Sequence, residues 1–211
     1  MVLSDNTFVL QRPFGPPIGE FPFPEILTAR LNEIFDTDID SGARLPGYGS
    51  KLAGEVSQEL RIPNEVCSEI GLTDYLQRCV AAYIEAAMGK QINTFELISA
   101  WIVRQYKGEY NPIHWHGGDV SGAGWLKVPD GMSGGGLKTA DHDGNIVFTH
   151  GSRQFLSGSK YEVTPKVGLI TVFPAYLMHT VYPFRVDGER RSLAFNARID
   201  ESLADPYSSR P

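Results

Sequence analysis

Apolar positions repeat at helical spacing in two stretches of the first half of the chain. Between Glu25 and about Asp38 they fall three or four residues apart, which predicts a short amphipathic helix. The same spacing is longer and more regular from Leu72 to Met88. Gly89 follows directly, and glycine commonly ends a helix in the left-handed conformation. A second helix is therefore predicted over 72–88.

The pattern changes after about Phe95. Short runs rich in β-branched and aromatic residues alternate with turn residues, and the predicted strands are 95–106, 112–116, 120–128, 136–140, 145–149, 160–164, 168–173, 177–183 and 190–199. No helical pattern separates these runs, so alternating β-α-β architecture is not expected. The run of short strands predicts a mainly β sandwich, jelly roll or barrel.

These elements predict a single domain over residues 1–211. Residues 1–94 would supply an extended N-terminal segment and supporting helices, and residues 95–200 would form the β core. The loops at 41–54, 130–136 and 150–159 are rich in glycine and serine. Such loops often border a binding site, so we expect them near the mouth of any pocket.

Composition narrows the class of protein and of partner. With 42% hydrophobic and 21% charged residues the chain is typical of a globular protein, and its net charge of −6 disfavours binding to nucleic acid or anionic membrane. Cys67 and Cys79 are too few and too far apart for a disulfide framework, so they are interpreted as buried residues in a reducing compartment. Without a long apolar run or a signal-type N-terminus, a cytoplasmic location with no membrane partner is expected.

Two of the five histidines form a His-x-His pair. In a strand, residues two apart project to the same face, so His114 and His116 would point one way and Trp115 the other. Two imidazoles do not complete a catalytic metal site, which needs a third protein ligand. His179 lies in a β-like run of apolar and aromatic residues, where an unpaired polar ring would be costly, and it is the natural third ligand.

Two alternatives stay open at this point. His114 and His116 could be a solvated pair and His179 a core histidine bonded to the backbone. Asp119 could also be a ligand in place of His116, provided that the two glycines before it bend the chain.

An anion-binding pair follows the third histidine. If a strand begins at Arg190, then Arg190 and Ser192 share a face while Arg191 points away, and a guanidinium and a hydroxyl can hold one carboxylate together. An edge-strand charge pair with nothing bound would give the same local sequence. The order of a His-x-His pair, a distal histidine and then an arginine indicates a metal site with an adjoining anion site more specifically than any one of these features alone.

Residues 104–198 resemble the catalytic core of the iron(II)- and 2-oxoglutarate-dependent oxygenases, nearest to the prolyl-hydroxylase-like branch with its bacterial and phage members. Residues 104–114 are similar to the Tyr, Gly, Tyr, Pro lead-in to the first iron ligand of that branch. Residues 121–129 stand where the family has its next inner strand, and residues 165–174 resemble the Pro-x-x-Gly strand before the distal histidine. The first 94 residues are similar only in general character.

The resemblance implies a double-stranded β-helix, also called a jelly roll or cupin-like fold. It implies Fe(II) bound by His114 and His179, and 2-oxoglutarate held at its distal carboxylate by Arg190 and Ser192, with Tyr106 as a further contact. Most members carry a carboxylate two residues after the first histidine, where this sequence has His116. Three neutral imidazoles leave the cation more electropositive and also suit Zn(II), so zinc is the alternative metal.

Three functions are weighed on this basis. The leading hypothesis is a dioxygenase that uses Fe(II), 2-oxoglutarate and O2 to hydroxylate a C–H bond of a protein side chain, a peptide or a small metabolite, with release of succinate and CO2. The second is a three-histidine zinc hydrolase or lyase, which would have no need of Arg190. The third is a non-catalytic β-sandwich binding module.

Overall fold

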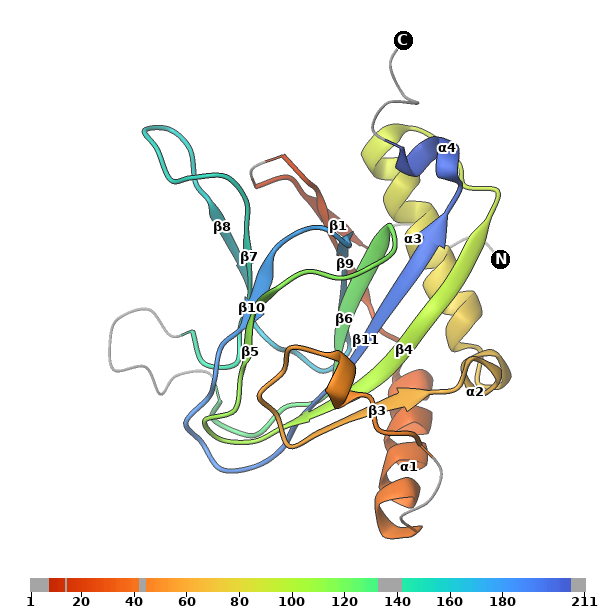
Figure 1. Cartoon of the computed structure of the whole chain (residues 1–211), viewed down its shortest axis with the longest axis vertical. Helices are drawn as coiled ribbons and strands as arrows, with labels where there is room; N and C mark the ends of the chain where they lie inside the picture. The colour runs from red at the N-terminus through yellow and green to blue at the C-terminus, as the bar shows by residue number, and fades with distance from the viewer. Residues whose placement is uncertain (1–7, 14, 42–44, 133–141, 206–211) are drawn as a thin grey trace.

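Two antiparallel sheets form the frame of the molecule. The computed structural model describes residues 8–13, 15–41, 45–132 and 142–205. The larger sheet has the strand order β1-β2-β9-β6-β11-β4-β3, and the smaller sheet has the order β5-β10-β7-β8. The two sheets lie side by side and splay apart at one end (Figure 1).

The strands are short in the smaller sheet and long at the centre of the larger one. Their bounds are β1 (Val9–Gln11), β2 (Ile18–Pro22), β3 (Gln58–Ile62), β4 (Phe95–Gln105), β5 (Asn111–His114), β6 (Val120–Lys127), β7 (Ile146–Thr149), β8 (Lys160–Val163), β9 (Leu169–Pro174), β10 (His179–Val181) and β11 (Arg190–Ile199). The predicted mainly β fold class is confirmed.

Eight of the nine strands predicted after Phe95 are present within a few residues of their expected bounds. The strand predicted at 136–140 lies outside the described residues. The prediction of an extended segment and supporting helices for the first 94 residues was incomplete, because this region also forms three strands, β1, β2 and β3. These strands form the two edges of the larger sheet, so the N-terminal region is part of the β framework.

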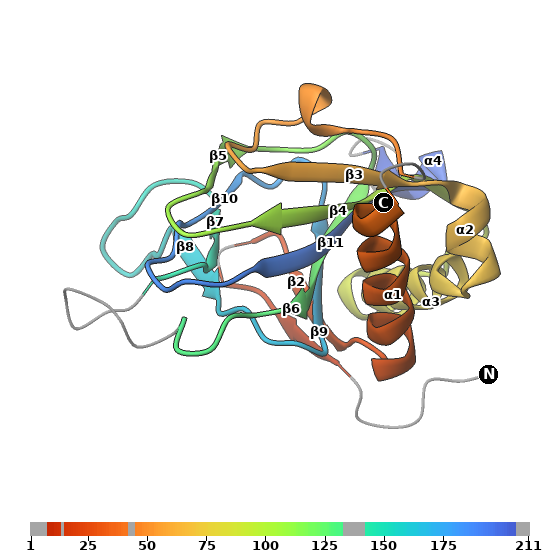
Figure 2. The same ribbon diagram turned by 90° about the horizontal axis from the view of Figure 1, so that it is seen from below.

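The helices cover the face of the larger sheet that is turned away from the smaller sheet (Figure 2). They are α1 (Glu25–Ser41), α2 (Asn64–Glu69), α3 (Leu72–Met88) and the short α4 (Glu201–Ala204), with a 3-10 turn at Gly49–Lys51. Both predicted helices are confirmed, and α3 ends at Gly89 with a φ of 67°. Gly71 separates α2, which carries Cys67, from α3, which carries Cys79.

Alternation along β11 divides its residues between two environments. Leu193, Phe195 and Ala197 join the apolar core beneath the helices. Arg190 and Ser192 face the opposite way, into the space between the sheets. A second apolar cluster, which includes Trp125 and Phe148, fills the part of that space next to His179. One strand therefore anchors the core and presents polar groups to an interior cavity.

Cys67 and Cys79 are free thiols buried in the helical core. Burial raises the pKa of Cys67 to about 12 and that of Cys79 to about 11. Both thiols therefore stay protonated and pack as apolar groups. Within the described parts of the chain, every helix falls short of the length and apolar character needed to span a membrane.

Candidate metal and cosubstrate site

Three histidines from two neighbouring strands meet between the sheets. His114 at the end of β5 lies directly opposite His179 at the start of β10 in the antiparallel register. His116 follows β5, and its backbone N–H donates to Ala175, which keeps the chain extended past the end of the strand. Each histidine offers a ring nitrogen, and these nitrogens all lie within 4.8 Å of one another. The sequence predicts that these three imidazoles meet, and the structure brings them together.

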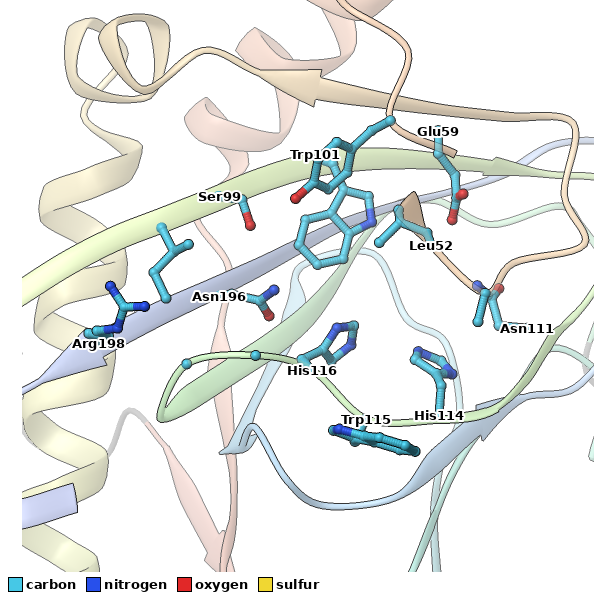
Figure 3. A pocket seen from close by; sticks show the side chains of 15 residues that line it. Leu52, Glu59, Ser99, Trp101, Asn111, His114, Trp115, His116, Asn196 and Arg198 are labelled. Atoms are coloured by element: carbon cyan, nitrogen blue, oxygen red, sulfur yellow. The ribbon is translucent and has the colours of Figure 1, made fainter. Parts of the chain in front are cut away.

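Backbone carbonyls fix the orientation of two of the rings. Nδ1 of His114 lies 2.7 Å from the carbonyl oxygen of Pro112, and Nδ1 of His179 lies 2.8 Å from that of Leu177. Because Nδ1–H donates to the carbonyl, Nε2 of each ring carries the lone pair and faces the other histidines. Nε2 of His116 is 3.2 Å from Nε2 of His179. Trp115 is 65% exposed and turns away, as the alternation predicted (Figure 3).

The surroundings keep the imidazoles uncharged at neutral pH. Burial lowers the pKa of His114, and burial together with the neighbouring His114 lowers the pKa of His116 to about 3. His179 is 3% exposed, and its pKa lies well below the ordinary value for the same reasons. A metal competes with protons for these nitrogens, so neutral rings are ready to bind a cation without first releasing protons.

This donor set fits a divalent transition metal. Nitrogen ligands about 2.0–2.1 Å from one cation lie roughly 3 Å apart, close to the 3.2 Å between His116 and His179. Phe148 and Phe173 pack their rings against His179, with centroids at 5.7 and 5.0 Å, and restrict its rotation. Three imidazoles on one side leave the other coordination positions for non-protein ligands.

A buried arginine lies across a narrow cavity from the histidines. Arg190 and Ser192 line this cavity together with His114, His116 and His179. Arg190 is 2% exposed, yet it makes no ion pair among the described residues, and its buried Nε has no hydrogen-bond partner there. Burial lowers its pKa to about 10, so the guanidinium remains cationic at neutral pH. An unpaired buried cation is costly, and an anionic ligand would offset that cost.

Gln105 holds the guanidinium in place. It stands opposite Arg190 in the β4·β11 register, is fully buried, and its Oε1 accepts a hydrogen bond of 2.9 Å from Arg190 Nη1. The amide of Gln105 in turn donates to the carbonyl of Glu109. Sequence analysis missed Gln105, because nothing local marks it and its role depends on pairing between distant strands.

The adjacent arginine has a structural role instead. Arg191 points to the helical side, as predicted, where Nη2 lies 2.7 Å from Asp36 and Nε lies 2.8 Å from Glu189. Its guanidinium also stacks over Phe35 of α1 at 4.4 Å. Of the two arginines, Arg190 is the one without a carboxylate partner among the described residues.

The structure does not bring Asp119 to the histidine group. Its Oδ2 accepts a 3.0 Å hydrogen bond from the backbone N–H of Ile199, and its backbone bonds to Ala175 and Ala197. Asp119 therefore fastens the start of β6 to the end of β11 rather than facing the metal ligands. The bend at the two preceding glycines turns it away from the site.

Asp119→Ala is accordingly expected to leave Fe(II) affinity unchanged and to lower the free energy of unfolding by about 1–2 kcal/mol, the typical loss for a hydrogen bond to a carboxylate. Calorimetry with Fe(II) under nitrogen and thermal unfolding of the metal-free protein measure the two quantities. A large loss of iron affinity would instead return Asp119 to the ligand set.

Tyr106 does not line the cavity that contains Arg190. Its ring lies under Arg104, with the guanidinium 5.2 Å from the ring centroid, and its backbone N–H donates to Glu109. Nothing in the described structure places its hydroxyl near Arg190 or Ser192. The expected contact of Tyr106 with the cosubstrate is therefore not supported, and the neighbouring Gln105 is the residue that contacts Arg190.

A second, wider cavity of about 420 Å³ opens from the histidines on the other side. His114, His116, Trp101 and Asn111 belong to both cavities, so the wide cavity and the narrow one meet at the histidine group. Of the three loops expected at the mouth, 41–54 does line the wide cavity. Part of 130–136 lies outside the described residues, and 150–159 lines neither cavity.

Comparisons with known proteins agree with this geometry. Residues 99–196 match the family described as "Putative 2OG-Fe(II) oxygenase". No curated protein matches the chain. Similar solved structures include a Pseudomonas putida prolyl-4-hydroxylase, with 17% identity, a TM-score of 0.55 and coverage of 92% of this chain and 94% of that chain.

Two further structures contain 2-oxoglutarate. The viral collagen prolyl hydroxylase of Paramecium bursaria Chlorella virus-1 in its 2-oxoglutarate complex has 15% identity and a TM-score of 0.54, over 85% of this chain and 94% of that chain. HygX from Streptomyces hygroscopicus, with nickel and 2-oxoglutarate bound, has 13% identity and a TM-score of 0.55, over 88% and 82%. At these identities the likeness establishes the fold, which is the double-stranded β-helix.

Proposed function

We propose that the chain is an Fe(II)- and 2-oxoglutarate-dependent oxygenase, as the match of residues 99–196 to that family supports. In this proposal His114, His116 and His179 bind the iron while Arg190 and Ser192 hold the cosubstrate. The enzyme is a dioxygenase. The observation that supports the residue assignment is a neutral three-histidine group that shares one narrow cavity with a buried guanidinium, which makes no ion pair among the described residues. A zinc hydrolase has no use for such a cation.

Bound iron and 2-oxoglutarate supply the oxidation of a substrate C–H bond by O2, with release of succinate and CO2. The protein's residues provide position and environment for that chemistry. Arg190, which is held by Gln105, would pair with the distal carboxylate of 2-oxoglutarate, and Ser192 on the same face would donate a further hydrogen bond. The opposite end of the cosubstrate is then directed toward the three imidazoles.

His116 in place of the usual carboxylate changes the charge balance. The imidazole ligands carry no charge, so the dianionic cosubstrate would supply the negative charge at the cation. We therefore propose that the site binds 2-oxoglutarate strongly only after the metal, since the cation and Arg190 together neutralise the dianion. The primary substrate would enter through the wider cavity.

Anaerobic titration tests this function. Addition of Fe(II) and then 2-oxoglutarate to the metal-free protein is expected to produce a metal-to-ligand absorption band in the visible range and saturable heat in calorimetry. Succinate formation should follow when O2 and a substrate are admitted. The proposal fails if neither the band nor the heat appears.

A further inference from the structure

A buried carboxylate lies in the wide cavity, outside the proposed iron and cosubstrate contacts. Glu59 on β3 is 5% exposed and lines the same cavity as Asn111 and His114, with Asn111 drawn between it and His114 (Figure 3). It is the one acidic side chain among the described residues of the lining. The sequence gives no hint of it, because the short strand that carries it was not predicted.

Glu59 has no partner in the described structure. None of the hydrogen bonds or ion pairs of the described residues uses its carboxylate, and its environment raises its pKa to about 7 through loss of hydration. Arg61, two residues along the same strand, donates to the carbonyl of Ile98 and lies 5.9 Å over the ring of Tyr48 instead. A buried ionised carboxylate without a partner is costly, so the free side chain takes up a proton more readily, and a ligand that supplies a cationic donor would stabilise the ionised form.

Gly54 packs closely against the carboxylate. A side-chain carbon built on Gly54 would come within 2.8 Å of Glu59 Oε1 and 2.7 Å of Asn111 Nδ2. Glycine at this position therefore leaves the acidic oxygen and the amide in place at the cavity wall.

The other walls of the cavity suit an organic cation. The rings of Tyr48 and Trp101 lie 5.6 Å apart at 51° and both line the cavity. Aromatic faces attract ammonium and guanidinium groups. The cation in the lining, Arg198, is 60% exposed at its side chain and pairs with Glu96 at the outer rim. The guanidinium of Arg61 already covers one face of Tyr48. The inner lining itself thus has a negative group, the ring of Trp101 and no cation among its described residues.

We propose that the primary substrate carries an amine or guanidinium group, and that Glu59 binds this cation while the neighbouring carbon lies at the iron. This inference rests on the proposed function, because it takes the wide cavity as the substrate site. It makes Glu59 a specificity-determining residue with no role in holding the metal or 2-oxoglutarate.

The test uses protein loaded with Zn(II) and 2-oxoglutarate, which prevents turnover and allows binding to be followed by NMR and calorimetry. The cationic probes are N-acetyl-lysine methylamide, N-acetyl-arginine methylamide and 1,5-diaminopentane. The neutral probe is N-acetyl-norleucine methylamide, which matches lysine in length. We expect at least one cationic probe to bind about tenfold or more tightly than the neutral probe, as a charged hydrogen bond would provide.

Glu59→Gln should remove this preference and leave 2-oxoglutarate binding unchanged. Glu55→Gln is the matched control, since it makes the same change four residues earlier at an exposed side chain outside the cavity. Tighter binding of the capped amino acids would indicate a peptide-borne cation, and tighter binding of the diamine a small molecule.

A second pair of variants tests the position of the Glu59 carboxylate. Gly54→Ala should displace Glu59 and Asn111 and weaken binding of the cationic probe about as much as Glu59→Gln does. Gly47→Ala adds a methyl group in open space and should have no effect.

The inference is overturned if no cationic probe binds better than the neutral probe, or if Glu59→Gln keeps the preference. Failure of the proposed function would look different, because 2-oxoglutarate would then not bind to the metal-loaded wild-type protein at all.

Discussion

His116→Ala is expected to lower Fe(II) affinity by at least about 100-fold, more than the loss typical when a partner behind a ligand is removed. Succinate formation should fall to background. His116 Nε2 lies 3.2 Å from His179 Nε2, so the variant would leave a cation with two adjacent imidazoles and one coordination position filled by water. Anaerobic calorimetry with Fe(II) measures the affinity directly.

Two variants separate loss of a ligand from loss of packing. His116→Asp restores a carboxylate ligand of the usual kind, so iron binding should be largely retained even though the ring and its contact with Trp101 are lost. His142→Ala removes a histidine that pairs with Glu162 outside the group and should leave iron affinity unchanged. If His116→Ala bound iron as tightly as the wild type, His116 would not be a ligand.

Arg190→Gln is expected to weaken 2-oxoglutarate binding by about 100-fold, in the range for loss of a buried charged partner. Fe(II) affinity should be unchanged, because the guanidinium is not a ligand. Arg190→Lys keeps the positive charge but lacks the planar pair of N–H donors, so its affinity for 2-oxoglutarate should be about tenfold lower than that of the wild type. Titration of 2-oxoglutarate into iron-loaded, oxygen-free protein gives both values.

Stability distinguishes this arginine from a structural one. Since Arg190 is buried without an anionic partner, Arg190→Gln should not lower, and should even raise, the unfolding midpoint of the ligand-free protein. Loss of Arg191 should destabilise the protein, because Asp36 would lose its partner and Glu189 would keep only Arg104 and Lys127 of its three cationic partners. A marked loss of stability in Arg190→Gln together with unchanged 2-oxoglutarate binding would refute the assignment.

The parts of the site that follow strand alternation could be predicted from the sequence. His114 and His116 share a face, as do Arg190 and Ser192, because residues two apart in a strand always do. His179 could be found from its apolar neighbours. These features are local, because the direction of side chains along a strand does not depend on which other strand it pairs with.

Features that depend on the pairing of distant strands could not be predicted. Gln105 reaches Arg190 only because β4 and β11 pair in one register, 85 residues apart. Glu59 enters the wide cavity because β3 adds to the edge of the larger sheet beside β4. β3 is five residues long, too short for alternation to stand out from its surroundings.

The N-terminal region shows the same limit. The sequence predicted a helical support for residues 1–94, and the helices do pack there. The region also supplies Tyr48, Leu52 and Glu59 to the wall of the wide cavity. We infer that this region, which resembles the family least, carries the choice of substrate.

The alternation at the start of β11 places strict demands on chain length. Arg190 and Arg191 are identical in chemistry and adjacent in sequence, yet one faces a cavity and the other faces a salt-bridge network. Inserting or deleting one residue inside this strand would exchange the two faces. Insertions and deletions among natural or engineered versions of this enzyme should therefore be tolerated in the surface loops. They should be excluded from the start of β11, where a change of one residue would exchange the positions of Arg190 and Arg191.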